Sequence, residues 1–330
     1  MSIAAPVVVA GTGIYLPETV VSNNDLASVI DTSDEWIVGH TGIRERRWLE
    51  PGRAVSDMCA EAADLALEAA SLTPASVDVI IVATYTSDEP LRSTALMVKE
   101  RLGAHRALVL DVTHAACVNG LHAMLLGCCL LQDSSIGSVL VLAADAASRV
   151  TDPQERTTRI LFGDAAAAVV LRRGTQAGSG LLSWDFGSEL SHAVEIPAGG
   201  SSLPPSAATL HARQHYVAMD GPAVWDAATR WLPDSILGAM ARAGLPVTDV
   251  SHFFVHQANL NIIKAAMGKL GIPMSRVPVT VDKLGNTGSA GVFTALHHSC
   301  SHGLLRPGDI YVLSAIGAGF QWGTLCFRHA

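Results

Sequence analysis

The sequence predicts an α/β fold built from two related halves, and two observations carry this prediction. Short apolar stretches alternate along the chain with longer segments in which apolar residues recur at helical spacing, as expected for strands and helices in turn. Residues 67–82 and 240–255 also share one order, which is a helical segment, a turn containing Leu and Pro, and an apolar strand. Helices that alternate with apolar strands predict mostly parallel sheets covered on both faces, here in two copies of one unit.

The first half opens with a strand at residues 7–10 and a turn, Gly11–Gly13, which lacks the third glycine of a nucleotide-binding loop. Asp31–Trp36 opens a helix that Thr32 or Ser33 caps. The Arg and Trp side chains of Thr41–Trp48 can hold an adenine or a phosphate, and a solvated charged loop is an equal alternative. The other predicted elements are helices at 55–70 and 93–102, strands at 77–83, 107–112 and 138–143, and a strand within 156–171.

The second half follows a segment rich in Gly, Ser and Pro, residues 174–206, which is predicted to connect the halves. We place the boundary so that residues 1–175 form the N-terminal half and residues 176–330 the C-terminal half. The predicted elements beyond the connection are helices at 225–243, 260–270 and 292–303 and strands at 250–255, 310–314 and 324–328. Each half is expected to end with a strand, a glycine turn and a last strand.

Cys117 lies between the predicted strand at 107–112 and a long apolar segment, extending to Leu131, that is predicted to be a buried helix. The first N–H groups of a helix have no internal partners, and its N-terminus carries partial positive charge. We therefore expect the Cys117 thiol to lose its proton more easily than a free thiol and to act as a nucleophile. On local sequence alone a buried structural cysteine is the more common case, and Cys128 and Cys129 are interpreted that way.

Two polar motifs in the second half favour the catalytic interpretation of Cys117. His256 follows the predicted strand at 250–255, and Asn286 lies in a glycine-rich loop before a helix. Ligands of such folds bind where strand ends of the two copies meet, so Cys117 and His256 can face one cleft. A nucleophilic Cys with a His and an Asn suits acyl transfer through a covalent thioester. Backbone N–H groups of Cys117 and of the turn at 317–319 could complete an oxyanion hole.

Composition limits the classes of function. Of 330 residues, 49% are hydrophobic and only 16% are charged, so part of the surface is expected to lie in an oligomer interface. The net charge of −8 and the lack of a basic stripe argue against nucleic-acid binding. No apolar run is long enough to cross a membrane, and the N-terminus lacks the pattern of a signal peptide. The six cysteines form no C-x-x-C pair, which favours reduced thiols in the cytoplasm.

A further cluster, His297–His302, contains three histidines and one cysteine. Its spacing is not a zinc pattern, and a helix over these residues would spread the side chains around its circumference. We therefore predict that these side chains are solvated or packed and that the chain holds no metal.

Several motifs in order along the chain carry a resemblance to a known family. They are residues 31–38 (DTSDEWIV), 41–46 (TGIRER), 111–117 (DVTHAAC), 161–164 (LFGD), 256–259 (HQAN), 285–287 (GNT) and 317–323 (GAGFQWG). On these motifs the chain resembles, over almost its whole length, the β-ketoacyl-acyl-carrier-protein synthase III family of thiolase-fold condensing enzymes. The resemblance implies a thiolase-like fold with its two duplicated halves in a five-layered α-β-α-β-α arrangement, and no bound cofactor.

The resemblance also implies a reaction. In such enzymes the cysteine, here Cys117, takes an acyl group from acyl-CoA. The histidine and asparagine, here His256 and Asn286, then assist decarboxylation of a malonyl thioester, and the resulting carbanion attacks the acyl-cysteine. The backbone N–H groups of Cys117 and Ala318 match the oxyanion hole of the family.

Other matched positions concern the substrates and the partner subunit. The contacts to CoA fall on Trp36, which would stack on the adenine, and on Arg156 and Asn259. Members of the family are usually homodimers in which the partner subunit closes the acyl pocket. The region that would do so here contains Leu91 and Arg92, and Asn119 is expected in the same pocket.

The sequence departs from the family pattern at several of these positions. Val118, Asn119 and Gly120 follow the cysteine where the family has Ala-Gly-Phe, which should reshape the acyl pocket. Ala318 replaces the oxyanion-hole glycine, and the adenine-clamping arginine after Trp36 is replaced by His40.

Basic residues that dock an acidic carrier protein in the family are replaced by Asn261 and Asp226, whereas Lys264 and Lys269 remain. Carrier docking is therefore weakened. This change favours a specialised pathway, related to polyketide or fatty-acid synthesis, over the start of ordinary fatty-acid synthesis.

Three hypotheses follow from the sequence. The first is a condensing enzyme that joins an acyl starter to a malonyl unit, supported by the intact Cys117, His256 and Asn286. The second is an acyltransferase that passes the acyl group from Cys117 to an alcohol or amine without decarboxylation, favoured by the altered pocket and disfavoured by Asn286. The third is a non-catalytic partner subunit, which the intact nucleophile disfavours.

Overall fold

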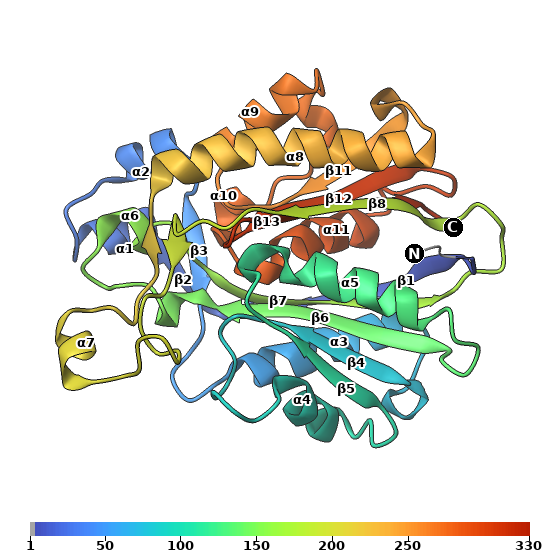
Figure 1. Ribbon diagram of the computed structural model, residues 1–330, viewed down its shortest axis with the longest axis horizontal. Coiled ribbons are helices and arrows are strands. Elements are labelled where there is room, and N and C mark those ends of the chain that lie inside the picture. The colour runs from blue at the N-terminus through green and yellow to red at the C-terminus, as the bar shows by residue number, and fades with distance from the viewer. Residues whose placement is uncertain (1–3) are drawn as a thin grey trace.

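Two β-sheets lie one above the other in the computed structural model, which describes residues 4–330 (Figure 1). The first sheet has the strand order β1-β7-β6-β4-β5 and the second has the order β11-β12-β13-β8. The strands of the first sheet are β1 (Val7–Tyr15), β4 (Val79–Ala83), β5 (Leu108–Val112), β6 (Ser138–Ala146) and β7 (Asp164–Arg173). Those of the second are β8 (Gly180–Ser188), β11 (Val250–Val255), β12 (Ile310–Gly317) and β13 (Gln321–Arg328).

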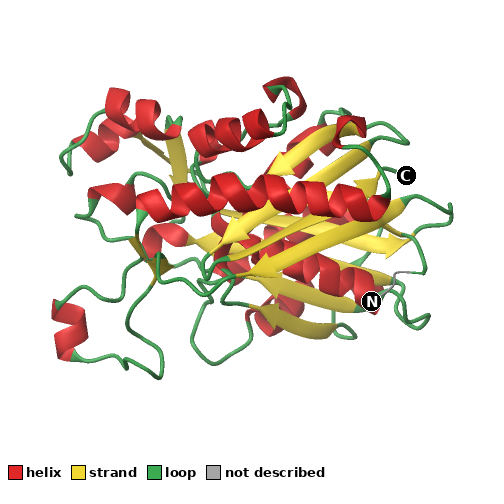
Figure 2. Cartoon of the chain, turned by 45° about the horizontal axis from the view of Figure 1, so that its top comes forward, coloured by secondary structure: helices red, strands yellow, loops and turns green. Residues whose placement is uncertain are grey.

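Helices form three layers around these sheets (Figures 1 and 2). The outer face of the first sheet is covered by α3 (Val55–Ala69) and α4 (Thr94–Leu102), and the outer face of the second by α8 (Gly221–Ala243) and α9 (Leu260–Lys269). Between the sheets lie α5 (Asn119–Leu130) and α11 (Gly291–Ser301). This is the five-layered α-β-α-β-α arrangement that the resemblance implied.

The duplication predicted from the sequence is visible in the strand pairing. Read from one edge, the first sheet runs β1-β7-β6-β4 and the second runs β8-β13-β12-β11. In both sheets the first two pairings are antiparallel and the third is parallel. Strand β5, which pairs in parallel with β4, extends the first sheet beyond the part that the halves share.

The prediction of mostly parallel sheets was wrong, because both sheets are mixed. In each half the last strand returns beside the preceding one, as β7 does beside β6 and β13 beside β12. Residues 318–320 are enough to join β12 to its antiparallel neighbour β13, whereas residues 147–163, which include α6 (Arg156–Arg159), join β6 to β7. Apolar strands buried on both faces look alike in sequence whichever direction they run.

The segment 174–206 is more than a connection, because it contains β8, the edge strand of the second sheet. Gly187 in this strand allows the Trp322 side chain to pack against it, since a Cβ there would lie 2.5 Å from the indole ring. Glycine is typical of loops, which is why the sequence concealed this strand. Strands of the first sheet end by Arg173 and those of the second begin at Gly180, on either side of our boundary at 175. That each half is a domain of its own stays a prediction.

The basic and aromatic segment 41–48 is partly a strand, and one of its arginines is not available to a phosphate. Arg46 lies in β3 (Glu45–Trp48), which pairs with β2 (Thr19–Ser22), and its side chain is fully buried. Its guanidinium donates to Asn23 Oδ1 and to the Ile160 carbonyl, both at 2.7 Å. The remaining helices are α1 (Asn23–Ala27), α2 (Asp34–Thr41), α6 (Arg156–Arg159), α7 (Ala207–His211) and α10 (Val281–Leu284), and two further short strands are β9 (Val194–Glu195) and β10 (Ala218–Met219).

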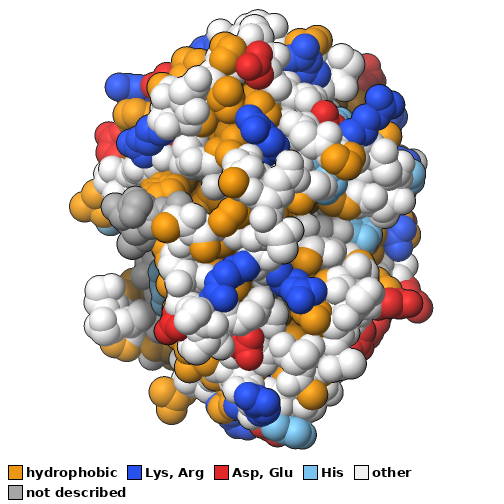
Figure 3. Space-filling view, turned by 90° about the vertical axis from the view of Figure 1, so that its right-hand side faces the viewer, with side chains coloured by type: hydrophobic (Ala, Val, Ile, Leu, Met, Phe, Trp, Pro, Cys, Tyr) orange, Lys and Arg blue, Asp and Glu red, His pale blue; other side chains and the backbone are white. Residues whose placement is uncertain are grey.

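Charged side chains are distributed without a dominant sign on the face shown in Figure 3, where basic and acidic groups are interspersed. Such a face offers no continuous basic track for a phosphate backbone. Among residues 4–330, no helix combines the length and the apolar character needed to span a bilayer.

The close packing of β1 on α3 leads to a first prediction. A Cβ at Gly13 would lie 2.2 Å from the Ala62 carbonyl oxygen, whereas a Cβ at Gly39, in α2, would meet no atom within 4 Å. We expect Gly13→Ala to lower the free energy of unfolding by about 1–3 kcal/mol through overpacking. Gly39→Ala is the control and should raise it by about 0.5–1 kcal/mol, since alanine loses less backbone entropy in a helix. Urea unfolding followed by circular dichroism measures both, and equal effects would contradict the packing argument.

Candidate active site

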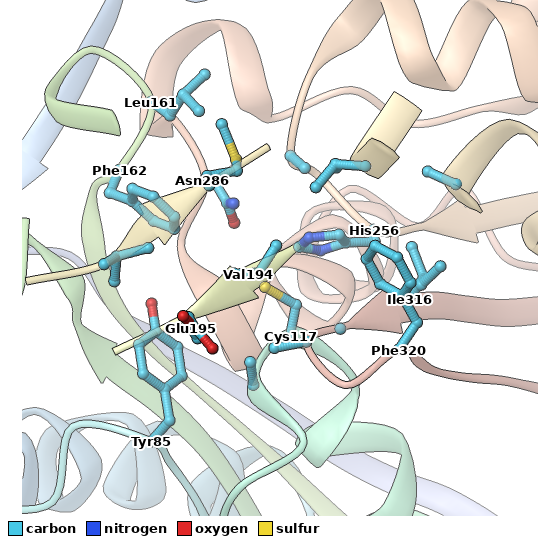
Figure 4. Close-up of a pocket in the computed structure, with 18 of the residues that line it drawn as sticks. Tyr85, Cys117, Leu161, Phe162, Val194, Glu195, His256, Asn286, Ile316 and Phe320 are labelled. Atoms are coloured by element: carbon cyan, nitrogen blue, oxygen red, sulfur yellow. The ribbon is translucent and has the colours of Figure 1, made fainter. Parts of the chain in front are cut away.

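A cavity of about 560 Å³ opens where the two halves meet (Figure 4). Cys117 of the first half and His256 and Asn286 of the second all line it, and Figure 4 shows their side chains directed toward the same space. Most of the remaining wall is apolar. It includes Leu161, Phe162, Val194, Ile196, Val217, Met219, Val224, Trp225, Leu232, Ile262, Ile316 and Phe320.

Cys117 lies in a single turn of 3₁₀ helix, Ala116–Val118, between the end of β5 and the start of α5. Two non-glycine residues just before it have left-handed backbone conformations, with φ of +68° at His114 and +47° at Ala116. Such conformations cost free energy and persist where the surroundings impose them. The turn that presents the thiol is therefore held by contacts from outside itself.

Those contacts come largely from the second half. The Ser289 hydroxyl donates to the Ala116 carbonyl at 3.1 Å. A Cβ at Gly317, the last residue of β12, would lie 2.0 Å from the Ala115 carbonyl oxygen and 3.0 Å from the Cys117 nitrogen. A Cβ at Gly120 would lie 2.9 Å from the Ser289 carbonyl oxygen. Glycine at 120 and 317 thus permits backbones of both halves to meet around the nucleophile.

The Cys117 thiol does not have the lowered pKa expected from a helix N-terminus. Its burial raises the pKa to about 12, and the negative charge of Asp145 adds to this effect. A hydrogen bond with the Asn286 side chain and one with its own backbone act in the opposite direction and are outweighed. The sequence pattern could not reveal that the two halves surround this thiol closely enough for desolvation to outweigh the helix N-terminus.

His256 follows β11, and its backbone N–H donates to the Ser314 carbonyl at 2.8 Å, which continues the pairing of β11 with β12. Burial lowers the pKa of the imidazole from its ordinary value of 6.5 to about 4. The ring is therefore neutral at pH 7. Its Nδ1 is buried without a hydrogen-bond partner among residues 4–330, which leaves Nε2 as the nitrogen available to a substrate.

Asn286 lies between α10 and the 3₁₀ turn Gly288–Ala290 that leads into α11. Its backbone is held to the first half, because its N–H donates to the Leu161 carbonyl at 2.7 Å and its carbonyl accepts from Gly163 at 3.0 Å. The side-chain Oδ1 accepts from the Gly288 N–H at 3.0 Å. This bond orients the carboxamide, so that its NH₂ group is the end left to donate hydrogen bonds.

The residues expected to bind CoA are only partly brought to this cavity. Asn259 lines it, and its Nδ2 donates to the His40 carbonyl at 3.1 Å while its Oδ1 caps α9. Trp36 and Arg156 are not among the lining residues, but they contact each other, with the guanidinium 4.4 Å from the indole ring centre. His40 also stacks on Trp36, with ring centres 4.1 Å apart.

The three residues expected in the acyl pocket do not line the cavity of this chain. Leu91 is 96% exposed, and Arg92 lies on the surface with its guanidinium 3.0 Å from Glu89. Asn119 is fully buried, and its Oδ1 accepts from the Ala115 N–H at 2.9 Å. In place of shaping the pocket, Asn119 stabilises the turn that carries Cys117. Ala318, expected in the oxyanion hole, does line the cavity.

Sequence reasoning missed one wall of the cavity. Val194 and Glu195 in β9 and Met219 in β10 form part of it, and they belong to the excursion between β8 and α8. Tyr85, after β4, was also missed. The sequence signal consists of two short apolar stretches, at 193–196 inside the Gly-, Ser- and Pro-rich region and at 217–219 after it, and neither shows a periodicity.

Comparison with known proteins agrees with this architecture. Residues 110–190 match the family model described as 3-oxoacyl-[acyl-carrier-protein (ACP)] synthase III, and residues 240–329 match the model of its C-terminal part. A β-ketoacyl-[acyl-carrier-protein] synthase III from Symbiobacterium thermophilum is 40% identical over 325 residues, which is 98% of each chain. The chain belongs to the β-ketoacyl-acyl-carrier-protein synthase III family. Its members are acyltransferases that act with acyl-CoA and acyl carrier protein.

Solved structures of synthase III enzymes superpose closely. The enzyme from Pseudomonas aeruginosa is 36% identical, with a TM-score of 0.89, and the match covers 98% of each chain. The priming β-ketosynthase of the R1128 polyketide pathway is 28% identical, with a TM-score of 0.90 and coverage of 98% of this chain and 96% of that one. The synthase III fold of this chain is therefore established.

Two departures from the synthase III pattern have structural consequences near the cavity. Asn261, which replaces a basic residue, donates from its side chain to the Gly39 and His40 carbonyls at 3.0 Å and so joins α9 to the end of α2. Asp226 is exposed on α8, and the Lys269 ammonium donates to the Thr229 carbonyl of the same helix at 2.9 Å.

The histidine cluster after the active-site loop lies on α11 and its C-terminal end, away from the synthase III active site. The His297 ring is hydrogen-bonded to the Thr12 hydroxyl at 3.0 Å, and His298 packs against His302 with ring centres 4.4 Å apart. Within residues 4–330, no group of three or more His, Cys, Asp or Glu side chains is placed to hold a metal ion.

The lowered pKa of His256 leads to a second prediction. In a nuclear magnetic resonance titration, the imidazole of this synthase III should change protonation near pH 4, and His256→Gln identifies its signal. Because the folded-state pKa lies below the unfolded value, the imidazole contributes stability that is present above pH 6.5 and is lost as the pH falls toward 4. A midpoint near 6.5 in the folded protein would contradict the burial argument.

Proposed function

We propose that this protein joins an acyl group, held as a thioester on Cys117, to the carbanion formed by decarboxylation of a malonyl thioester. The observation that carries the proposal is the orientation of Asn286. The Gly288 N–H occupies its Oδ1, so its NH₂ group is available beside the thiol, in the same cavity as the neutral imidazole of His256. Two neutral donors are suited to an enolate oxygen and are not needed for simple acyl transfer.

In the first step the Cys117 sulfur attacks the carbonyl carbon of acyl-CoA. The raised pKa means that the thiol carries its proton at pH 7, so the proton must leave as the carbon–sulfur bond forms. The neutral imidazole of His256 can accept it and pass it to the departing CoA thiolate. The products are acyl-Cys117 and free CoA. Backbone N–H groups of Cys117 and Ala318 are the donors for the oxyanion.

In the second step the malonyl thioester loses carbon dioxide, and the electron pair of the broken bond moves toward the thioester carbonyl as an enolate. In the tautomer that carries its proton on Nε2, His256 donates to that oxygen together with the NH₂ group of Asn286. The carbanion carbon attacks the carbonyl of acyl-Cys117, the carbon–sulfur bond breaks, and the departing Cys117 thiolate takes a proton from solvent. The product is a β-ketoacyl thioester, and the apolar walls of the cavity exclude competing water.

The proposal includes the substrates and partners. CoA is expected to place its adenine on Trp36, where Arg156 now covers the ring, and Asn259 at the cavity is its nearer contact. The exposed Leu91 and Arg92 are expected to be covered by the partner subunit of a homodimer. Carrier docking is weakened by Asn261 and Asp226, which favours a specialised pathway in the cytoplasm.

The central test follows the mass of the intact protein. With acyl-CoA, the wild type should gain one acyl group, which malonyl-CoA or malonyl-carrier protein then removes with release of carbon dioxide. Cys117→Ala should gain nothing, whereas Cys129→Ala, near the C-terminal end of α5, is the matched control and should behave as wild type. Asn286→Ala should still be acylated but condense on the order of a hundredfold more slowly, because a donor to the enolate is lost.

The same experiment separates the alternatives. An acyl group that stays on Cys117 with malonyl donors and leaves with an alcohol or amine would make the protein a transferase on the same scaffold. No mass gain from any acyl-CoA or acyl-carrier protein would make it a non-catalytic partner subunit.

A second test addresses CoA recognition. Trp36→Ala should raise KM for acyl-CoA about three- to tenfold through the loss of adenine stacking. An acyl-N-acetylcysteamine thioester lacks the adenine, so its kcat/KM should be unchanged by the same substitution. An equal loss with both donors would show that Trp36 acts on the fold and not on the nucleotide.

A further inference from the structure

A buried carboxylate joins the two halves immediately behind the nucleophile. Asp145, near the end of β6, is fully buried. Its Oδ1 accepts from the Thr84 hydroxyl and the Tyr85 N–H, both at 2.9 Å, and from the Thr86 hydroxyl at 3.2 Å. These donors belong to the first half. Its Oδ2 accepts from the Ser289 N–H of the second half at 2.7 Å.

The bond to Ser289 acts on the loop that carries Asn286. Gly288, between these two residues, donates to Asn286 Oδ1 at 3.0 Å, and this bond orients the carboxamide toward the thiol. Gly288 has a left-handed φ of +57°, and a Cβ there would lie 2.3 Å from Asp145 Oδ2. The carboxylate therefore packs directly on the turn from which Asn286 is oriented. Ser289 also donates from its hydroxyl to the Ala116 carbonyl, next to the nucleophile.

Asp145 faces other titratable groups but forms no ion pair with any of residues 4–330. Burial raises the pKa of three neighbouring groups, and the charge of Asp145 raises it further. These groups are Cys59 on α3, Tyr85 after β4 and Cys117 before α5. Burial raises the pKa of Asp145 itself to about 6, while its hydrogen bonds act in the opposite direction. A carboxylate with four donors satisfies its acceptor sites without a cation, which is how it can remain charged there.

We propose that Asp145 is a positioning residue for the decarboxylation step, which holds the Asn286 loop of the second half in register with the nucleophile turn of the first. The inference rests on the proposed function, since it assigns Asp145 to the step that Asn286 serves. It assigns no direct contact between Asp145 and the substrate.

Asp145→Asn tests the proposal because the amide nearly preserves the shape of the carboxylate. An amide accepts through one oxygen only. Its NH₂ group must face either the Ser289 N–H or the Tyr85 N–H, and both are donors. We expect the loop to move, so that malonyl decarboxylation by the acylated enzyme falls on the order of tenfold to a hundredfold. Acylation of Cys117 by acyl-CoA should stay within about threefold, since Asn286 is not needed for it.

A second readout separates this role from a general loss of structure. Removing the negative charge should shift the pH midpoint of Cys117 alkylation by iodoacetamide downward, because Asp145 raises the pKa of that thiol more than the Asn286 hydrogen bond lowers it. Unfolding or loosening would speed alkylation of every cysteine. Peptide mass spectrometry distinguishes these results by comparing Cys117 with the fully buried Cys59 and Cys128.

Two further variants complete the test. Asp164→Asn is the matched control, because Asp164 is also fully buried and its carboxylate accepts from Leu49 and Ser148, with no hydrogen bond among residues 4–330 to the turn at 286–289. It should change neither readout. Gly288→Ala presses a methyl group against Asp145 while retaining its charge, so decarboxylation should fall without a downward shift of the alkylation midpoint. If Asp145→Asn does not fold, the decarboxylation rate of Gly288→Ala tests the proposal in its place.

The outcomes are distinct. Selective loss of decarboxylation in Asp145→Asn and Gly288→Ala supports the proposal. A decarboxylation rate within threefold of wild type in either folded variant would overturn the proposal. Equal losses of acylation and decarboxylation, if Asp164→Asn shows them too, would also overturn it. If the wild type itself neither acylates nor decarboxylates, the proposed function fails. The shift of the Cys117 alkylation midpoint in Asp145→Asn would then still show whether Asp145 raises the pKa of that thiol.

Discussion

The close approach of two backbones around Cys117 is the constraint on which the rest of the site depends. The end of β12 can reach the nucleophile turn only because residue 317 is glycine, and Gly120 permits the same approach by the Ser289 carbonyl. These contacts hold left-handed conformations at His114 and Ala116 that the chain would not adopt alone. The site is consequently a property of the interface between the halves, and neither half contains it.

The close contact between the two halves also determines which of the active-site side chains carry charge. By excluding water, the interface keeps both the thiol of Cys117 and the imidazole of His256 neutral at pH 7, with pKa values of about 12 and about 4. An ion pair between them would carry charge into an apolar cavity, which is unfavourable. Reactivity must therefore arise when a thioester enters and its leaving group can take the proton. A neutral imidazole exists in two tautomers, so its Nε2 can accept a proton in one tautomer and donate to an enolate in the other.

Several sequence predictions agree with the structure, and the reasons for the failures are physical. Helical spacing located α3, α8 and α9 closely, since each buries one face on a sheet. Strand direction was predicted wrongly because strands buried on both faces have no directional signal. The strand β8 was missed because Gly187, which the Trp322 ring requires, looks like a loop residue in isolation. Asn119 was expected in the acyl pocket, but it is not among the residues that line the cavity. Its side chain instead accepts from the Ala115 N–H within the turn that carries Cys117, and the sequence did not show this contact.

The sequence by itself determined the α/β class, the duplication, and the identity of the three polar residues that reach the cavity. These features depend on periodicity and on local motifs, which neighbours along the chain specify. The tertiary structure alone decided the ionisation of Cys117 and His256, the orientation of Asn286, the wall between Val194 and Met219, and the place of Asp145 behind the nucleophile. The Asn286 carboxamide is oriented by a bond to Gly288 within its own loop, which the sequence does not specify. The other features depend on groups far apart in sequence, whose desolvation and hydrogen bonds exist only once the chain has folded.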